Sequence, residues 1–428
     1  MRKEKYTSKL QYIILLFILS LVSAKVYGGN DVKAKDAGFV NPDLLNLVFE
    51  KLYNLEKNKN GKINIVHIGD SHIQADLFTN AIRQALQSRF GNGGWGFTFP
   101  YRLVNTNGTR TVQYVSNASW QSQRNIYPVA DVGVGLSGIA LFTSSEDFVI
   151  RLSVEDEYKF NNIKIIYPTQ QPQYKVSVSA LLLETQVSDP SSDAAVGVSA
   201  PAYIYHKVKS GESLSVISRK YRVTVAQIKA VNGLRSNTIH AGKSLKIPTK
   251  KTTAAKTTTT KATKPNLKVD GNIDFVELEN NPYYSSYTCD SILDRITILP
   301  NGKNPTYNLN GFVLQNDRPG VIYHAIGVNG AKLSDYSKYP LFFKQLPILN
   351  PDLIILSFGT NESFGKMSAS QYLMQLKDFV ADIRRQCGPD VAILVMTPPP
   401  SLFRRGRTNQ YVVDYSTALM NLTNLPVW

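Results

Sequence analysis

The chain is poor in the residues that cross-link a fold or carry it through a membrane. Only two of its 428 residues are cysteines, Cys289 and Cys387. Two cysteines are too few for a disulfide scaffold, and because they fall in segments assigned to different domains we predict no bridge between them. No apolar run after residue 24 is long enough for a membrane helix. The length allows two or three domains with buried cores of their own.

Residues 1–24 have the organisation of a secretory signal. A basic start is followed by an apolar run from Tyr12 to Val22, and the segment ends Val22-Ser23-Ala24. The run is short for a membrane span, and its end suits a signal peptidase. We therefore predict a secreted protein in the periplasm or cell envelope of a bacterium. An uncleaved anchor is the alternative, whereas the lack of a cysteine near the cleavage site argues against a lipoprotein.

The net charge of +16 is concentrated in one part of the chain. Residues 203–248 hold nine Lys and Arg and one Glu, and residues 249–268 add six Lys. The signal segment is also basic, so the remainder of the chain is close to neutral. This distribution disfavours nucleic acid as a partner. It favours attraction to an anionic wall or envelope polymer, with a merely solubilising surface as the alternative.

Strands and helices alternate near both ends of the chain. Buried strands are predicted at 63–68, 321–326, 353–358 and 391–396, and apolar stripes at helical spacing at 78–90 and 372–383. Such alternation predicts a parallel sheet with helices on both faces. Binding and catalytic residues in such sheets lie at the carboxyl ends of the strands.

The chain between these α/β segments changes character three times. Segments with β-branched residues in an alternating pattern, separated by frequent turns, predict a β-rich module, which we interpret as a sandwich. A basic module and its tether interrupt this β-rich module. Residues 249–268 are mostly Thr, Lys and Ala, with one Pro, and cannot bury a core. The predicted division is α/β at 25–104, β-rich at 105–202, a small module at 203–248, a linker at 249–268, β-rich at 269–320 and α/β at 321–428.

The small module carries a specific motif. It reads Tyr205-His206-Lys207-Val208-Lys209-Ser210-Gly211-Glu212, then Val231-Asn232-Gly233-Leu234, and ends Gly242-Lys243-Ser244-Leu245-Lys246-Ile247-Pro248. This text resembles a LysM module, and its pattern predicts strand, helix, helix and strand. The resemblance implies binding to peptidoglycan or another glycan that contains N-acetylglucosamine. The contacts it implies are Ser210, Gly211, Glu212, Ser213, Leu214, Leu234, Arg235, Ser236, Asn237 and Thr238.

Three motifs follow three predicted strands. They are Gly69-Asp70-Ser71, Val328-Asn329-Gly330-Ala331 and Gly359-Thr360-Asn361-Glu362. A serine at the start of a helix lies where developing negative charge is favoured, although the Gly-Asp-Ser motif taken alone favours a simple helix cap. Together and in this order, the motifs resemble the SGNH (GDSL-type) hydrolases. That family has a flavodoxin-like parallel sheet, which the strand and helix pattern here also predicts.

The resemblance assigns roles to these residues. Ser71 would be the nucleophile, supported by Asp70, and Gly330 and Asn361 would donate hydrogen bonds to the oxyanion. Acyl transfer needs such donors already in place, and losing one side-chain donor costs on the order of 10²–10³ in rate. A glycine lets the backbone approach the substrate without a side chain. No cofactor or metal is predicted.

Residues 66–100 carry a narrower resemblance. Gly-Asp-Ser-His is followed by Ala75-Asp76 and by Gly91-Asn92-Gly93-Gly94-Trp95-Gly96, with Pro100 beyond. This text is similar to the peptidoglycan O-acetylesterase branch of the SGNH enzymes. Some of that branch also carry a β-sandwich between the first and second motifs. The resemblance implies removal of acetyl groups from the O6 position of muramic acid.

The chain differs from the family in its catalytic base. In the family this base lies in a C-terminal Asp-x-x-His motif, and the motif does not occur in this sequence. None of the five histidines, at 67, 72, 206, 240 and 324, fits the role of general base by position. Because Leu425–Trp428 resembles the start of a strand, we expect a truncated product that lacks its last strand, helix and dyad. Three hypotheses follow: a wall-tethered O-acetylesterase, a glycan-binding protein with an inert scaffold, or an O-deacetylase of another polysaccharide.

Overall fold

The computed structural model describes residues 41–179 except 131, then 182–185, 203–248 with gaps, 266–269, and 273–422 except 404 and 405. The gaps within 203–248 are 209–211, 222, 233, 235, 237, 240 and 241. Contacts divide the chain into two compact units, one of residues 186–263 and the other of the chain on either side. No helix in the described ranges is long and apolar enough to cross a membrane.

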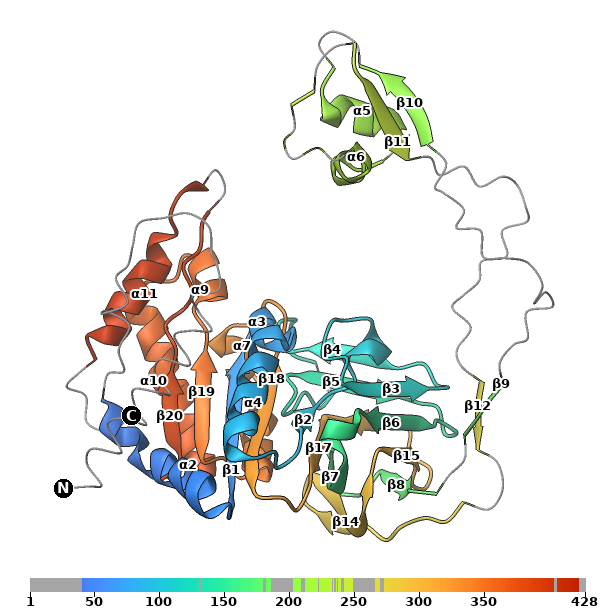
Figure 1. Ribbon diagram of the computed structural model, residues 1–428, viewed down its shortest axis with the longest axis vertical. Coiled ribbons are helices and arrows are strands. Elements are labelled where there is room, and N and C mark those ends of the chain that lie inside the picture. Colours follow the sequence, from blue (N-terminus) through green and yellow to red (C-terminus); the bar gives the residue numbers. More distant parts are fainter. Residues whose placement is uncertain are drawn as a thin grey trace. The chain divides into compact units, whose positions relative to one another are not determined.

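The α/β part of the larger unit is built on a parallel sheet in the order β18-β1-β19-β20 (Figure 1). These strands are β18 (Gly320–Gly327), β1 (Lys62–Gly69), β19 (Leu353–Ser357) and β20 (Ala392–Val395). Strand β1 is central, pairing along its whole length with β18 and from Ile65 onward with β19. Because all four strands run the same way, their carboxyl ends share one edge of the sheet.

Helices cover both faces of this sheet, which confirms the predicted α/β class. The helices of this part are η1 (Pro42–Leu45), α2 (Asn46–Asn58), α3 (Ser71–Gln74), α4 (Leu77–Phe90), α7 (Leu333–Ser337), α8 (Pro340–Gln345), η4 (Leu346–Leu349), α9 (Thr360–Phe364), α10 (Ala369–Cys387) and α11 (Gln410–Met420). Ile63 and Ile65 of β1 pack in one cluster with residues of α2 and α4. Val66 and Ile68 belong to another cluster, with residues of α10. Alternate residues of the central strand thus serve opposite faces.

Three antiparallel sheets form the β-rich part. The orders are β13-β14-β7-β17-β2, β3-β6-β15-β8 and β16-β5-β4. The strands are β2 (Gly96–Thr98), β3 (Val112–Ser116), β4 (Gln121–Arg124), β5 (Ile139–Thr143), β6 (Ile150–Val154), β7 (Phe160–Ile166), β8 (Tyr174–Ser177), β13 (Glu279–Asn281), β14 (Tyr284–Leu293), β15 (Arg295–Pro300), β16 (Tyr307–Leu309) and β17 (Gly311–Gln315), with short helices η2 (Tyr101–Val104) and η3 (Asp156–Tyr158). Strand β2 pairs with β17, so a β-rich strand already occurs before residue 105.

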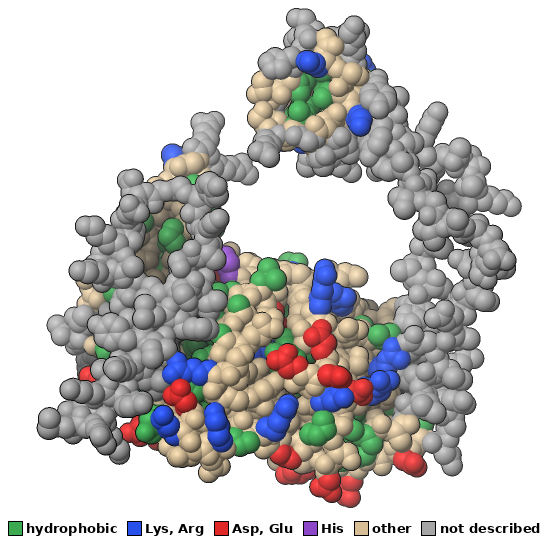
Figure 2. Space-filling view, viewed as in Figure 1, with side chains coloured by type: hydrophobic (Ala, Val, Ile, Leu, Met, Phe, Trp, Pro, Cys, Tyr) green, Lys and Arg blue, Asp and Glu red, His purple; other side chains and the backbone are tan. Residues whose placement is uncertain are grey.

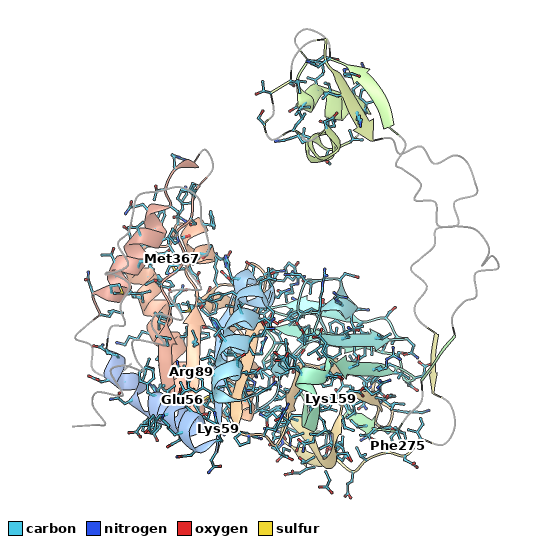
Figure 3. All side chains as sticks on the ribbon, viewed as in Figure 1. Glu56, Lys59, Arg89, Lys159, Phe275 and Met367 are labelled. Carbon is cyan, nitrogen blue, oxygen red and sulfur yellow. The ribbon has the colours of Figure 1, made fainter. Side chains whose placement is uncertain are left out.

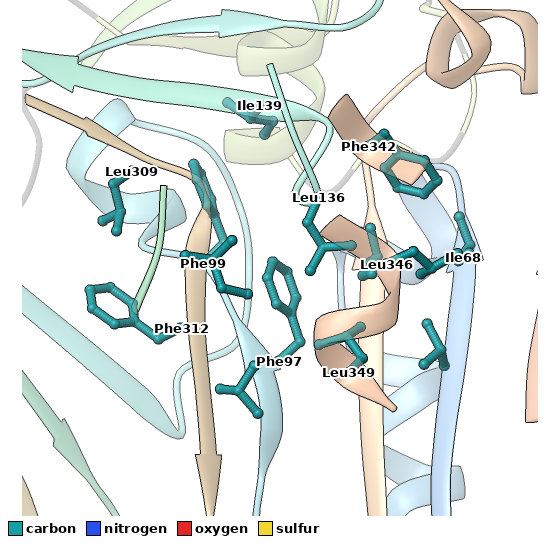
Figure 4. Packing of buried hydrophobic residues seen from close by; sticks show 14 of the residues in the cluster. Ile68, Phe97, Phe99, Leu136, Ile139, Leu309, Phe312, Phe342, Leu346 and Leu349 are labelled. Carbon is teal, nitrogen blue, oxygen red and sulfur yellow. The ribbon is translucent and has the colours of Figure 1, made fainter. Parts of the chain in front are cut away.

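One continuous core joins the α/β and β-rich parts. Ile68 of β1, Phe97 of β2 and Phe312 of β17 belong to the same buried cluster, together with Leu346 and Leu349 of η4 (Figure 4). Phe97 also donates its backbone N–H to His324 of β18, at 3.0 Å. The β-rich part is therefore fixed to the side of the parallel sheet by buried apolar surface, the dominant stabilising term in folding.

Charged side chains of both signs are interspersed over the face of the larger unit seen in Figure 2.

Two ion pairs anchor helix α2. Arg89 of α4 pairs with Glu56 at 3.0 Å (Figure 3), and Lys51 pairs with Asp352, just before β19. Exposed pairs of this kind each contribute about 0–1 kcal/mol. The helix is thus held mainly by its buried apolar residues.

The smaller unit has the predicted strand, helix, helix, strand order. It contains β10 (Tyr203–Lys207), α5 (Leu214–Tyr221), α6 (Val225–Asn232) and β11 (Ser244–Pro248), with β10 and β11 antiparallel. Six buried residues make its own core: Val208, Leu214, Ile217, Ile228, Leu245 and Ile247. In the larger unit, β9 (Leu182–Thr185) pairs antiparallel with β12 (Asn266–Val269), so the chain leaves and re-enters that unit through paired strands.

Candidate active site

Ser71 lies at the carboxyl end of the central strand. Strand β1 ends at Gly69, Asp70 caps the short helix α3, and Ser71 is the first residue of that helix. The turn packs directly on neighbouring backbone. A Cβ on Gly69 would lie 2.6 Å from the carbonyl oxygen of Ser357, and one on Gly327 would lie 2.3 Å from the backbone nitrogen of Gln74. Glycine at both strand ends lets the Ser71 turn pack against β18 and β19.

Gly330 lies in the turn that follows β18, the neighbour of β1. The turn is closed by a hydrogen bond from the Ala331 N–H to the carbonyl of Val328, at 3.0 Å. Gly330 has a φ of +84°, is exposed, and has no heavy atom within 4 Å of the position a Cβ would take. A side chain at this position would therefore meet no atom of the described residues.

Asn361 links the three strand-end motifs. It lies in α9, which follows β19, and is half-buried. Its Nδ2 donates to Oδ2 of Asp70 at 3.2 Å and to the carbonyl of Ala331 at 3.0 Å. Asp70 precedes Ser71 and Ala331 follows Gly330, so the structure brings together the segments that carry all three predicted residues. Both amide N–H groups are engaged, and donation to an oxyanion requires that one of these bonds be exchanged.

Glu362 holds two of these motifs in register. Its carboxylate accepts the backbone N–H of Leu333 and that of Gly359, both at 2.9 Å. The side chain is 1% exposed, and burial raises the pKa of this carboxyl above its usual value. Gly359 itself has a φ of +116°, a conformation that L-residues rarely adopt. Glu362 therefore fixes the loop before α9 against the start of α7.

Asp70 is a buried carboxylate shared by two partners. Besides Asn361, it accepts the backbone N–H of His72 at 3.0 Å and binds His72 Nδ1 at 2.8 Å. The hydrogen bond to Asp70 raises the pKa of His72. The imidazole is 57% exposed. Because Nδ1 of His72 binds Asp70, Nε2 takes no part in that bond. His72 follows Ser71 directly in the chain.

His67 and His324 are internal histidines of the sheet. Each is 0% exposed, and burial lowers the pKa of both to about 3. His67 is bonded to the Tyr323 hydroxyl at 2.7 Å and the Ser357 hydroxyl at 2.6 Å. His324 accepts the Phe97 N–H through Nδ1 and bonds Asn64 through Nε2. Both rings are neutral and fully partnered, so neither is placed to take a proton from Ser71.

Sequence reasoning missed Gln74, the last residue of α3. Its side chain is 2% exposed and joins α3 to the Gly330 turn and to residues 106 and 107. A lone glutamine in a short helix carries no pattern that would single it out. Within the described residues, no group of three or more His, Cys, Asp or Glu side chains is placed to hold a metal ion. Cys289 and Cys387 are not bonded to each other.

The predicted glycan contacts of the smaller unit are described only in part. Ser210, Gly211, Arg235 and Asn237 lie outside the described residues. Leu214 is 2% exposed within the core, so its side chain is not the surface contact that the resemblance implied. Glu212 accepts a hydrogen bond from His206 Nε2 at 2.7 Å. Asn232 pairs with the backbone of Lys246 in β11, which fixes the end of α6 on the hairpin.

Residues 206–248 match the family model of the LysM domain. The chain contains a LysM domain. It is similar to the N-acetylmuramoyl-L-alanine amidase sle1 of Staphylococcus aureus MRSA252, with 29% identity over 164 residues, or 38% of this chain and 46% of the amidase. It is also similar to the probable peptidoglycan endopeptidase LytE of Bacillus subtilis 168, with 45% identity over 51 residues, or 12% of this chain and 15% of LytE.

The chain thus spans less than half the length of these curated relatives. Among solved structures, it is similar to one of a peptidoglycan O-acetylesterase, with a TM-score of 0.47 and 19% identity over 88% of this chain and 80% of that one. It is also similar to a family two carbohydrate esterase from Cellvibrio japonicus, with a TM-score of 0.20 and 9% identity over 73% of this chain.

Proposed function

We propose that the larger unit is a serine esterase of the SGNH type that removes O-acetyl groups from cell-wall glycan, and that the LysM domain holds it on peptidoglycan. The observation that carries this proposal is the position of the Asn361 amide, bonded both to Asp70 and to Ala331. Three turns, each after a parallel strand, thereby meet around Ser71. Convergence of a nucleophile with hydrogen-bond donors at one place is what acyl transfer requires.

In this proposal the Ser71 hydroxyl attacks the acetyl carbonyl. The sugar hydroxyl leaves, and water then hydrolyses the acetyl-serine to acetate. The developing oxyanion receives hydrogen bonds from the Gly330 N–H and, once one of its present bonds is exchanged, from the Asn361 amide. Helix α3 is only four residues long, so donors of the two flanking turns contribute more than its dipole.

A serine hydroxyl is a weak nucleophile without an adjacent base. Three histidines lie in the larger unit, and two of them are sealed in the core. His72 is the third. It is exposed and bonded to a buried carboxylate, the arrangement that orients a basic imidazole. The His72→Ala variant therefore tests whether this ring supplies the base in the present chain.

The test is acetate release from p-nitrophenyl acetate and from O-acetylated peptidoglycan. Because the sequence contains no Asp-x-x-His, we expect low turnover, which Ser71→Ala abolishes and which the matched variant Ser370→Ala, at an exposed serine of α10, leaves unchanged. Asn361→Ala should lower kcat by about 10²–10³. Turnover by Ser71→Ala equal to that of the unaltered chain would refute the esterase proposal. O-acetylated xylan, assayed in parallel, distinguishes a wall-glycan esterase from an O-deacetylase of another polysaccharide.

A second candidate is a glycan-binding protein that acts through its LysM domain alone. The burial of His67 and His324 favours it, because it removes two of three histidines from the choice of base. The domain has its own core, so residues 203–248 can be tested as a fragment. We expect this fragment to sediment with peptidoglycan and chitin. Sedimentation with neither polymer would contradict both the second candidate and the tethering role.

A further inference from the structure

Every polar group of the Gln74 side chain is used in linking the nucleophile helix to other segments. Its Oε1 accepts the backbone N–H of Asn329 at 2.7 Å. Its Nε2 donates to Thr106 Oγ1 at 2.9 Å and to the backbone carbonyl of Asn107 at 2.8 Å. Gln74 lies three residues after Ser71, and Asn329 precedes Gly330. One buried amide therefore ties α3, the Gly330 turn and the loop after η2 together.

These bonds fix which way each amide faces. A backbone N–H only donates and a backbone carbonyl only accepts, so the oxygen of Gln74 must face Asn329 and its nitrogen must face Asn107. The Asn107 side-chain atom 3.2 Å from Gln74 Nε2 is consequently the acceptor Oδ1. Asn329 Nδ2 donates to the same Oδ1 at 2.7 Å. Gln74 Nε2 has two N–H groups for three acceptors, so its longer bond to Oδ1 is a shared one and Asn329 is the principal donor to the Asn107 oxygen. The NH₂ group of Asn107 is turned away from Asn329 and Gln74.

The NH₂ group of Asn107 has no role in the proposed reaction. Asn107 is exposed, and the hydrogen bonds found among the described residues include none from its Nδ2. Asn107 lies in the β-rich part of the larger unit. Its side-chain oxygen is bonded by Asn329, which is next to Gly330, and by Gln74, which lies three residues after Ser71. A preset pair of N–H donors beside the oxyanion turn suits an acceptor on the sugar that carries the ester.

We propose that Asn107 is a substrate-binding residue whose amide donates to a hydroxyl or acetamido oxygen of the acetylated sugar, and that Gln74 is the positioning residue for Asn107 and the Gly330 turn. This inference rests on the proposed function, since it places the sugar at the same site. It goes further by assigning recognition of the sugar to a residue that precedes β3 and lies outside all three strand-end motifs.

The experiment follows asparagine side-chain signals by NMR in the full chain labelled with ¹⁵N-asparagine. A Ser71→Ala background prevents turnover, and the probe is an O-acetylated disaccharide of N-acetylglucosamine and N-acetylmuramic acid. We expect the side-chain signals of Asn107 and Asn361 to shift together, while Asn232 reports the LysM domain separately. Asn107→Asp keeps the acceptor and removes the donor, and should weaken binding read from Asn361 about tenfold. Asn105→Asp, at an exposed asparagine of the same loop, should not.

Hydrogen exchange tests the positioning role. Gln74→Met should speed exchange of the Asn329 amide at least about tenfold, because the one acceptor found for it among the described residues is lost. The control is Gln87→Met, since Gln87 is also buried but donates to Gly94 and Val321. Unchanged exchange in Gln74→Met would overturn the positioning role. A shift of Asn361 without Asn107 would overturn the binding role alone, whereas no shift at either residue would overturn the proposed function as well.

Discussion

The two buried histidines make the larger unit sensitive to mild acid. Burial lowers the pKa of His67 and His324 to about 3, whereas an unfolded histidine has a pKa of about 6.5. A group whose pKa is lower in the folded state stabilises the fold above its unfolded pKa, and this stability is lost as the pH falls. Between about pH 8 and pH 5, the loss is about 2 kcal/mol for each ring. The two together lose about 4 kcal/mol, a large part of the ~5–15 kcal/mol that stabilises a typical domain.

The chain offers a selective probe for this measurement. Its three tryptophans, Trp95, Trp120 and Trp428, all lie outside the 186–263 unit, and the first two are buried in the larger one. Urea unfolding followed by tryptophan fluorescence therefore reports the larger unit. We expect the two rings to lower the free energy of unfolding by about 4 kcal/mol from about pH 8 to pH 5, a loss that the opposite contribution of His72 partly offsets.

Variants separate the histidines from other titrating groups. His324→Gln should lower stability at about pH 8 but reduce the pH-dependent loss to about 2 kcal/mol, since one titrating ring remains. His72→Gln is the control, because Asp70 raises the pKa of His72 and its contribution has the opposite sign, present at low pH and lost as the pH rises. Stability that stays constant between these pH values, or a full loss in His324→Gln, would show that the rings are not held neutral in the core.

Three further predictions use the same fluorescence assay. Asp76→Asn should cost about 3–5 kcal/mol, because Arg83, with 0% of its side chain exposed and stacked 3.9 Å from Trp95, would lose its carboxylate partner; a loss below about 1 kcal/mol would contradict this. Gly359→Ala should cost more than Gly388→Ala. Both have positive φ, but a Cβ at Gly359 would lie 2.9 Å from Pro398 whereas Gly388 has open space, so equal losses would refute the packing argument. Glu362→Gln should cost about 1–3 kcal/mol and lower any Ser71-dependent turnover, because one of two backbone donors would face an amide NH₂; unchanged stability would show that Glu362 does not hold the two motifs in register.

The α/β part was largely predictable because its buried parallel strands correspond to short apolar runs in the sequence that end in glycine. Strands predicted at 63–68 and 353–358 are observed at Lys62–Gly69 and Leu353–Ser357. The LysM domain was predictable for a different reason, since its motif is contiguous and specific. The roles of Ser71, Gly330 and Asn361 remain predictions, although the structure brings their segments together.

Other features were beyond sequence reasoning because they depend on contacts between distant segments. Strand β2 is a three-residue segment without alternation, and only its pairing with β17 assigns it to the β-rich part. The sequence places His67 inside a predicted strand and His72 next to Ser71, but it does not show that the His72 ring is bonded to the Asp70 carboxylate. Burial lowers the pKa of His67, whereas the hydrogen bond to Asp70 raises the pKa of His72.

Sequence alone determined the parallel strands of the α/β part, the turns that carry the polar residues and the LysM domain, because these properties follow from local periodicity and contiguous motifs. Tertiary structure alone decided that the amide of Gln74 bridges residues 33 and 255 positions away. Glutamine occurs in many contexts, in helices, at the surface or buried, so the residue type alone does not predict its partners. Its hydrogen bonds depend on which donors and acceptors the folded chain places around it.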